Sequence, residues 1–452
     1  MAVVERIPTA RRSGDIRRLS STGGRETTDR ICDNHMIYNP PFYKKLFHFT
    51  RRMLAEYWLS MMPALQIGIT GSQGKTNTTR VLSKLLSSVA PTIVTDVNLD
   101  TIYNVPITAL KVRPSTKFAV FELGVDHPGE MDFHLQIVKP KIGVVTGISP
   151  VHTDKEHFGS IENLIKEKRK LIEALPEDGY AILNYDDENV RQMASRTKAK
   201  VLWYGTDPKH CEVWSDPKSV RLSLEGTSFT MFHDLQRDSS SEVNVDKKTT
   251  SEVEIRTKLI GKHHVYTILS SLLTCLTATK LADMNAPINQ LIRALAAIEP
   301  LLGRMSVEKG PMSTIILNDA LRANPTSTAV GLQTLSELEY KEGKKIAILA
   351  EMGELQHPEV EHKKIGQLLK TLNIDYVIGI GPMQRYVVEE SQSKQAFFAK
   401  DVYEATETLK KFIKKGDLIY LKGSLYRHVE RVLQILEGKK PPADLIIERS
   451  VV

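Results

Sequence analysis

The chain has 452 residues, of which 41% are hydrophobic and 25% are charged, and its formal net charge is +7. This length allows two or three domains with cores of their own, and the composition is that of a globular enzyme rather than a fibrous or disordered protein. The three cysteines are far apart and form no C-x-x-C pair, which argues against a disulfide framework or zinc site and agrees with a reducing cytoplasm.

The N-terminal region carries much of the excess positive charge. Residues 1–34 combine arginines with Ser, Thr and Gly without a periodic apolar pattern, so we expect a disordered extension. A transit peptide or a nucleic-acid-binding tail is the alternative, although acidic residues count against the first and missing aromatics against the second. Residues 46–65 are apolar and aromatic but interrupted by charges. They predict an amphipathic helix that packs on the body or contacts a membrane surface, and not a transmembrane span.

The segment ITGSQGKTNTTR, residues 69–80, lies between the apolar run LQIGIT and a predicted helix at residues 78–90. A phosphate-binding loop needs glycines that turn backbone N–H groups onto the phosphates, a lysine for the terminal phosphates and a hydroxyl for magnesium. The strict motif would begin with glycine where the chain has Ile69, but the shorter form T-G-S-x-G-K-T is present. A plain surface turn is the alternative. The order of strand, loop and helix favours phosphate binding by Gly71, Ser72, Gln73, Gly74, Lys75 and Thr76.

The following sequence predicts two α/β domains. Strands alternate with helices to about residue 205, which indicates a parallel sheet with crossover helices. Residues 213–256 predict antiparallel hairpins with an exposed loop near residues 238–250, and a second alternating series begins near Gly303. We therefore expect a P-loop central domain with a parallel sheet and a C-terminal Rossmann-like α/β domain, with ligands bound at the carboxyl ends of strands. The expected divisions are residues 1–62 (tail and short helix), 63–302 and 303–452.

Two further segments carry candidate functional side chains. In FELGVDHPGEM, residues 121–131, Glu122 ends an apolar strand, where a carboxylate serves as a metal ligand or base, or only as a cap. In ISPVHTDKEHFGSIENLIKEKRKL, residues 148–171, a histidine-bearing loop leads into a basic helix. By itself, such a helix face is usually solvated surface.

Together, these segments resemble the Mur ligase family, the ATP-dependent amide-forming enzymes of cell-wall peptide synthesis, which also include folylpolyglutamate synthetases. The resemblance covers about residues 63–430, with several motifs in the family order. Residues 121–131, 317–327, 350–366 and 421–424 are most similar to the D-alanyl-D-alanine-adding members, and residues 98–110 resemble their loop ending in G-V-P-L-T. The resemblance implies an ADP-forming carboxylate–amine ligase that adds D-alanyl-D-alanine to a peptidoglycan precursor.

The resemblance also implies roles for single residues. Lys75 would contact the terminal phosphates of ATP, and Thr76 and Glu122 would hold a first Mg²⁺. His152 would bind a second Mg²⁺, although His157 is a rival because two extra residues separate His152 from the FGS triplet. Lys168 falls where the family has a carbamylated, metal-binding lysine, the alternative being an ordinary surface lysine. In the C-terminal part, the residues with implied roles near the nucleotide or the cleft are Arg304, Asp319, Asn324, Lys422 and Ser424.

The chain departs from the family pattern at three places. GKHHVYT, residues 261–267, replaces the usual G-x-H-N-x-x-N, and Leu321 and Arg322 stand where the family has a tyrosine. Only 62 residues precede the P-loop strand, fewer than a separate uridine-binding domain needs, so a UDP-sugar would be bound differently or not at all.

Two alternatives therefore stay open. One is a Mur-type ligase with a non-UDP acceptor, such as an amino acid polymer, a pseudomurein peptide or a folate-like molecule. The other is a non-catalytic ATP-binding scaffold. In each catalytic case, we expect a cytoplasmic monomer that takes a small-molecule or nucleotide-linked peptide and an amino acid or dipeptide, with no nucleic-acid partner.

Overall fold

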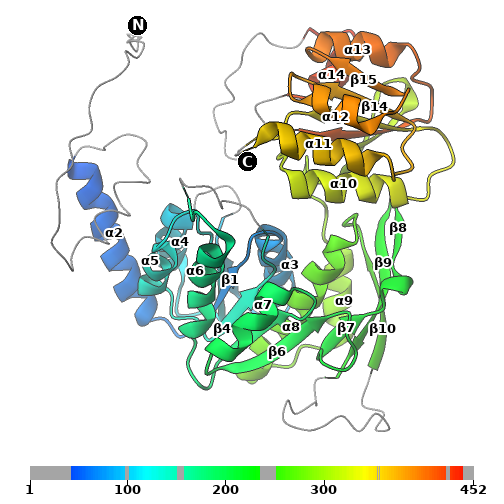
Figure 1. Ribbon diagram of the computed structural model, residues 1–452. Helices are drawn as coiled ribbons and strands as arrows, with labels where there is room; N and C mark the ends of the chain where they lie inside the picture. The colour runs from blue at the N-terminus through cyan, green and yellow to red at the C-terminus, as the bar shows by residue number, and fades with distance from the viewer. Residues whose placement is uncertain are drawn as a thin grey trace, which may run out of the picture.

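The computed structural model describes residues 42–96, 101–149, 157–234, 251–353, 355, 357–423 and 428–440, so the predicted tail at residues 1–34 lies outside the described residues. Two α/β units follow one another along the chain, each built on its own sheet (Figure 1). This architecture confirms the predicted fold class. Within the described ranges, no helix is both long and apolar enough to cross a membrane.

The central unit is built on a parallel sheet in which β1 lies between β3 and β4. Its strands are short apolar runs, and most of their residues are buried, as expected when helices cover both faces. The parallel strands, in the spatial order β7-β6-β5-β4-β1-β3-β2, are β1 (Leu65–Thr70), β2 (Thr92–Val94), β3 (Phe118–Glu122), β4 (Ile142–Val145), β5 (Tyr180–Asn184), β6 (Lys200–Gly205) and β7 (Val213–Ser215).

An antiparallel extension continues this sheet beyond β7. Strand β9 (Gly226–His233) pairs antiparallel with β7, with β8 (Arg221–Ser223) and with β10 (Ser251–Thr257). The predicted hairpins are therefore confirmed. The exposed loop expected near residues 238–250 lies outside the described residues.

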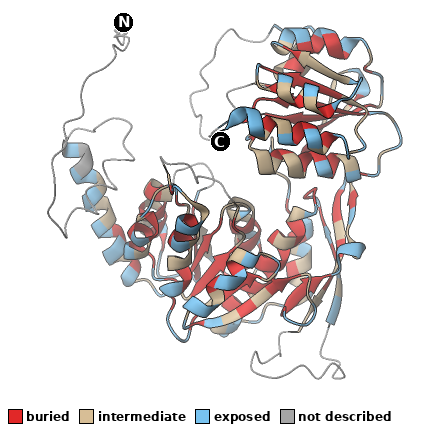
Figure 2. Cartoon of the chain, viewed as in Figure 1, coloured by how far each residue is buried: buried red, intermediate tan, exposed pale blue. Residues whose placement is uncertain are grey.

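Helices cover both faces of the central sheet, and the buried side chains lie between the layers (Figure 2). Helices α3, α8 and α9 pack on one face, α4, α5, α6 and α7 pack on the other, and α2 packs on the outside of α4 and α5. They are α2 (Phe42–Ser60), α3 (Lys75–Ser87), α4 (Thr101–Lys111), α5 (Glu130–Ile137), α6 (Ile161–Glu173), α7 (Glu188–Met193), α8 (His263–Leu281) and α9 (Ile288–Ala296).

Three predictions need correction: the end of one helix, the start of another, and a predicted loop that forms a helix. Helix α2 ends before residue 65 because Pro63 and the residue preceding it disfavour helical backbone. Helix α3 begins three residues earlier than predicted. Residues 101–111, expected to belong to a loop, form α4, because Ile102, Val105 and Ala109 recur at helical spacing and are buried on the sheet.

The C-terminal unit has a six-stranded sheet in the order β11-β12-β16-β13-β14-β15, parallel except for β11. The alternation of strands and helices that the sequence predicts from about Gly303 is confirmed. The strands are β11 (Ser306–Lys309), β12 (Ile315–Asp319), β13 (Lys345–Ala350), β14 (Tyr376–Ile380), β15 (Ala396–Ala399) and β16 (Leu418–Lys422); the helices are α10 (Pro325–Glu337), α11 (Pro358–Leu369), α12 (Gln384–Ser391), α13 (Val402–Lys410) and α14 (Arg431–Leu436).

The two units share an apolar contact. Leu222 of β8 and Ile260 are buried in the same cluster as Leu317 and Leu332 of the C-terminal unit. Figure 1 shows β8 reaching up to α10. The hairpin extension of the first sheet therefore packs into the second unit, in addition to the chain connection near residues 300–304.

Candidate active site

The turn between β1 and α3 is a glycine loop pressed against the end of β4. Gly71 has a φ of 145° and Gly74 a φ of 79°, a region of backbone conformation that favours glycine. A Cβ at Gly71 would lie 2.1 Å from Thr146 Oγ1, so the close approach also requires glycine there. Ser72 N donates to Gly147 O at 2.7 Å. The loop is thus fixed on the carboxyl end of β4.

The first turn of α3 is open to an anion. Gly74 caps this helix without a side-chain hydrogen bond, and the first turn contains no acidic residue. Helix α6 differs, since Ser160 Oγ accepts from Asn163 N at 3.3 Å. Uncapped N–H groups at the positive end of a helix are favourable for phosphate. The geometry therefore suits the phosphate cradle that the sequence predicts.

Two lysines from different helices converge on this loop. Lys75 Nζ donates to Gly71 O at 2.8 Å, and Lys168 Nζ, from α6, donates to the same oxygen at 3.1 Å. Lys168 is buried, so it is not the ordinary surface lysine that the sequence left as an alternative. Burial lowers the pKa of Lys168 well below its usual value, and the charge of Lys75 lowers it further. The low pKa shifts Lys168 toward its neutral amine, so Lys75 is the side chain that offers positive charge to an anionic ligand at this loop.

Oxygen ligands suited to Mg²⁺ lie beside the lysines. Thr76 Oγ1 donates to Glu122 Oε1 at 3.0 Å, and Glu122 N donates to Thr95 Oγ1 at 2.9 Å. A hydroxyl and a carboxylate are the kinds of ligand that Mg²⁺ prefers, so these residues fit the predicted metal site. His152 lies outside the described residues. The rival His157 is described, and its ring centre lies 5.2 Å from that of His127, on the loop after β3.

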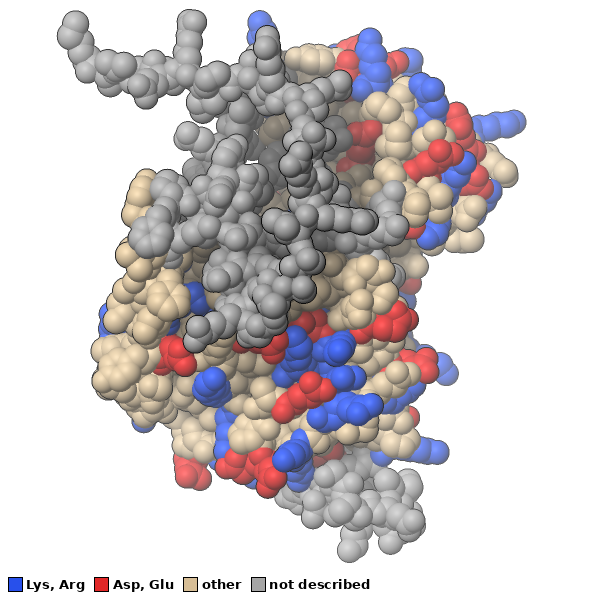
Figure 3. Space-filling view, turned by 60° about the vertical axis from the view of Figure 1, so that its left-hand side comes forward, with Lys and Arg blue, Asp and Glu red and all other residues tan. Residues whose placement is uncertain are grey.

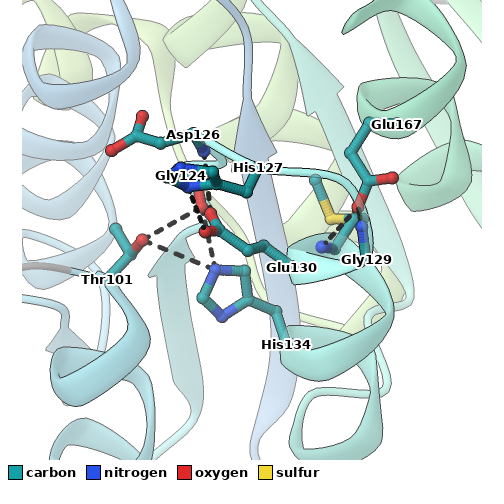
Figure 4. Close-up of polar contacts among 9 residues, drawn as sticks. Thr101, Gly124, Asp126, His127, Gly129, Glu130, His134 and Glu167 are labelled. Carbon is teal, nitrogen blue, oxygen red and sulfur yellow. Dashed lines mark hydrogen bonds and ion pairs between the residues drawn. The ribbon is translucent and has the colours of Figure 1, made fainter. Parts of the chain in front are cut away.

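A polar network holds that loop, as Figure 4 shows. Asp126 N donates to Glu130 Oε2 at 2.7 Å, and His134 Nε2 lies 2.8 Å from Gly124 O. Thr101, at the start of α4, donates from Oγ1 to the same Gly124 carbonyl at 3.0 Å. The loop that follows Glu122 is therefore tied to α4 and α5.

Helix α6 ties the same loop to the phosphate loop. Glu167 Oε1 accepts from Gly129 N at 2.9 Å and from Met131 N at 2.8 Å, while its Oε2 accepts from Lys170 Nζ at 2.7 Å. The next residue on α6 is Lys168. Two neighbouring side chains on one helix thus contact the two loops that carry the candidate catalytic groups. Glu167 was not among the residues predicted from the sequence, where it stands out only as an acidic residue within a basic helix.

In the C-terminal unit, Asp319 and Lys422 lie at the carboxyl ends of adjacent strands. Lys422 Nζ donates to Asp319 Oδ2 at 2.7 Å, and Tyr420 OH donates to the same oxygen at 3.0 Å. Burial raises the pKa of Asp319, and the Lys422 charge opposes that rise. Gly331 makes this arrangement possible, since a Cβ there would lie 1.8 Å from the Tyr420 hydroxyl.

The junction of the two units gathers cations. Arg304 lies close enough to Arg80 and Arg322 for their charges, together with burial, to lower its pKa, while Asp319 and Glu122 act in the opposite direction. Its Nε is buried and has no hydrogen-bond partner among the described residues. This agrees with the expected position of Arg304 near an anion. Arg80 and Arg322 were not predicted from the sequence, where Arg322 marks only the loss of the family's tyrosine.

Asn324 has a structural contact of its own. Its Oδ1 accepts from Ser327 N at 2.8 Å, and Ser327 Oγ accepts from Asn324 N at 3.1 Å, so the two form a capping box at the start of α10. The side chain expected to contact the nucleotide is therefore engaged as a helix cap. Ser424 lies outside the described residues.

Comparison with known proteins gives consistent matches along the chain. The model of the Mur ligase middle domain matches residues 69–275, and that of the Mur ligase glutamate ligase domain matches residues 303–425, together well over half of the sequence. The UDP-N-acetylmuramoyl-tripeptide–D-alanyl-D-alanine ligase of Escherichia coli (strain K12) is 26% identical over 387 residues, which are 85% of this chain and 79% of that protein.

Solved structures agree on the fold. MurF from Acinetobacter baumannii matches with a TM-score of 0.73 and 23% identity, over 87% of this chain and 81% of that one. The MurF ligase from Thermotoga maritima, solved in complex with ADP, matches with a TM-score of 0.69 and 22% identity, over 87% and 84% of the two chains. At these identities, the likeness speaks for a common fold.

Proposed function

Because the chain belongs to the Mur ligase family of ATP-dependent amide ligases, we propose that it joins D-alanyl-D-alanine to a UDP-N-acetylmuramoyl-tripeptide in peptidoglycan synthesis. The named activity of the similar ligases supports this substrate pair. We also propose that the reaction is of the ADP-forming, acid–D-amino-acid type and takes place in the cytoplasm. We place the boundary between the two catalytic domains at residues 302 and 303.

One observation carries the proposal most directly. Lys75 and Lys168 meet at the Gly71 carbonyl, next to the Thr76 and Glu122 oxygens. A carboxylate and ATP are both anionic, so a ligase of this kind must hold negative charges together in one place. Lys75 supplies positive charge there, and the Thr76 and Glu122 oxygens can hold Mg²⁺, so this cluster is suited to that task.

The proposed reaction has two steps. The γ-phosphoryl group moves from ATP to the substrate carboxylate, which gives an acyl phosphate and ADP. The amine of D-alanyl-D-alanine then attacks the acyl carbon, the new C–N bond forms, and phosphate leaves with the electrons of the broken C–O bond while the amine loses a proton. The Gly71–Gly74 backbone and Lys75 bind the phosphates and neutralise charge as it moves, so the protein contributes positioning and electrostatics.

Thr76 and Glu122 would hold Mg²⁺, which would neutralise phosphate charge when bound. We propose that Lys168 reacts with carbon dioxide to form a carbamate and thereby becomes an anionic metal ligand. Carbamate formation needs the neutral amine, and the burial that lowers the pKa of Lys168 increases the neutral fraction. Protein incubated with ¹³C-bicarbonate should show a carbamate NMR signal that is absent from Lys168→Arg.

The activity is tested by ADP release with UDP-N-acetylmuramoyl-tripeptide, D-alanyl-D-alanine and ATP. We expect Lys75→Met to lower kcat/KM by at least about a hundredfold, and Lys84→Met, an exposed lysine on the same helix, to leave it unchanged. ADP release that requires a different acceptor, such as an amino acid polymer, a pseudomurein peptide or a folate, would support the ligase activity but contradict the proposed acceptor. No release with any acceptor, while ATP still binds, would identify a scaffold.

A further inference from the structure

Helix α2 presents an apolar stripe to solvent. Tyr43, Phe47 and Tyr57 are 66%, 61% and 66% exposed, and the other members are similarly open. Their spacing of three and four residues places them on one side of the helix, where the pale blue of Figure 2 marks exposed residues. From residue 43 to residue 57, this side is about 21 Å long and contains no charged residue. The stripe consists of Tyr43, Leu46, Phe47, Met53, Leu54 and Tyr57, with Met61 directly after the helix.

The opposite side of α2 is firmly packed on the body. Ala55 and Leu59 are fully buried against the helices of the central unit. Trp58 Nε1 donates to Val112 O at 2.8 Å, and the Arg52 guanidinium lies 3.0 Å from the ring centre of Phe133. The stripe is the outer surface of a helix whose inner surface is already satisfied.

Positive charge is concentrated at the same end of the chain. Residues 1–52 contain 11 Lys and Arg against 5 Asp and Glu, a net +6, whereas the whole chain carries +7. The remaining 400 residues are thus almost neutral. In Figure 3, acidic and basic side chains are mixed on the described surface, with no large field of one sign in this view. An uncharged apolar stripe and a basic segment therefore lie within the same stretch of sequence.

We propose that α2 and the basic segment before it bind the surface of an anionic phospholipid bilayer. Aromatic and aliphatic side chains on one helix face are suited to the boundary between headgroups and acyl chains, and Lys and Arg are attracted to anionic headgroups. A second copy of the chain fits less well, because a symmetric contact through α2 would bring two segments of net +6 together. The net charge favours a negative partner over an identical one.

Helix α2, which carries the apolar stripe, lies close to the candidate active site. The ring centres of His48 on α2 and Tyr103 on α4 are 5.1 Å apart. Helix α4 begins at Thr101, which donates to Gly124 O in the loop that follows Glu122. The proposed membrane-bound helix is thus connected through a single helix to the catalytic edge of the sheet. The inference goes beyond the ligase reaction and does not depend on it.

The test is sedimentation of the full-length protein with vesicles. We expect binding to vesicles of equal parts phosphatidylglycerol and phosphatidylcholine, at least tenfold weaker binding to pure phosphatidylcholine, and weakening by salt. The triple variant Phe47→Ser, Leu54→Ser and Tyr57→Ser should bind the anionic vesicles at least tenfold more weakly. Val360→Ser with Tyr403→Ser, two apolar residues of the C-terminal unit that are 50% and 56% exposed, is the matched control and should bind like the wild type.

Circular dichroism and ATP binding without vesicles show that each variant is folded. The proposal is overturned if the wild type does not sediment with anionic vesicles, or if the triple variant sediments as well as the wild type. Light scattering tests whether a second copy of the chain covers the stripe instead. If the wild type is a dimer, the triple variant is a monomer and the wild type does not bind vesicles, the stripe is a contact between two copies.

Discussion

Gly71→Ala tests whether the phosphate loop is as tightly packed as the structure indicates. The φ of 145° is unfavourable for alanine, at about 1–2 kcal/mol for a left-handed backbone. The new Cβ would also lie 2.1 Å from Thr146 Oγ1, and overpacking of this kind costs about 1–3 kcal/mol. Together, these effects predict a loss of about 2–5 kcal/mol in the free energy of unfolding. The loop should also shift, which would raise the KM for ATP by about tenfold or more.

Two further variants separate backbone strain from the clash. Gly438 has a φ of 77°, but a Cβ there meets no atom within 4 Å, so Gly438→Ala should cost only about 1–2 kcal/mol and leave the KM for ATP unchanged. Thr146→Ala removes the clashing hydroxyl. The double variant with Gly71→Ala should therefore be more stable than the sum of the single effects predicts, by about 1 kcal/mol or more.

Urea unfolding followed by circular dichroism gives the free energies, and ADP release at varied ATP gives KM. Two outcomes would refute the packing described for the loop. One is a Gly71→Ala variant that is no less stable than Gly438→Ala and keeps the wild-type KM for ATP. The other is strict additivity of Gly71→Ala and Thr146→Ala.

Two other variants test the remaining parts of the site, and a third tests the histidine His263 in the segment at residues 261–267. Glu122→Gln removes the carboxylate charge beside Thr76, and we expect the Mg²⁺ concentration for half-maximal ADP release to rise by at least about tenfold; an unchanged Mg²⁺ titration would exclude Glu122 as a ligand. Lys422→Met leaves Asp319 buried without its cation and should cost about 3–5 kcal/mol in urea unfolding, whereas a loss below about 1 kcal/mol would contradict the buried pair. Burial lowers the pKa of His263 from 6.5 to about 4, so the unfolded chain takes up this proton first as the pH falls. The histidine should thus remove up to about 1.4 kcal/mol of stability per pH unit between pH 6.5 and 4, and His263→Gln should show a shallower loss over the same range.

The features that could be predicted from the sequence are those set by neighbouring residues. Apolar runs ended by Thr70 and Glu122 indicated buried parallel strands, and the glycines after Thr70 indicated the phosphate loop, because strand, turn and helix preferences are local. The meeting of Lys168 with Gly71, 97 residues apart, could not be read from spacing. It depends on how α6 packs on the sheet, and only the family resemblance pointed to Lys168.

At two places the resemblance drew attention away from a local signal. Asn324, followed by Pro325 and Ser327, has the pattern of a helix cap, which the structure contains, whereas its contact with the nucleotide stays a prediction. Residues 101–111 have apolar side chains at helical spacing, yet they were expected in a loop. The cations Arg80 and Arg322 were missed for a different reason. Their charges converge only when the two units come together, and no single segment contains that information.

The burial of Leu222 and Ile260 in the core of the C-terminal unit has a consequence for how the molecule moves and melts. If the two halves were joined only by the segment near residues 300–304, each could swing and unfold independently. Because Leu222 and Ile260 pack in the second core, a rotation of the C-terminal unit relative to the first must either carry β8 with it or break these contacts. The same contacts couple the two cores, so heating should produce a single cooperative transition rather than two separate ones.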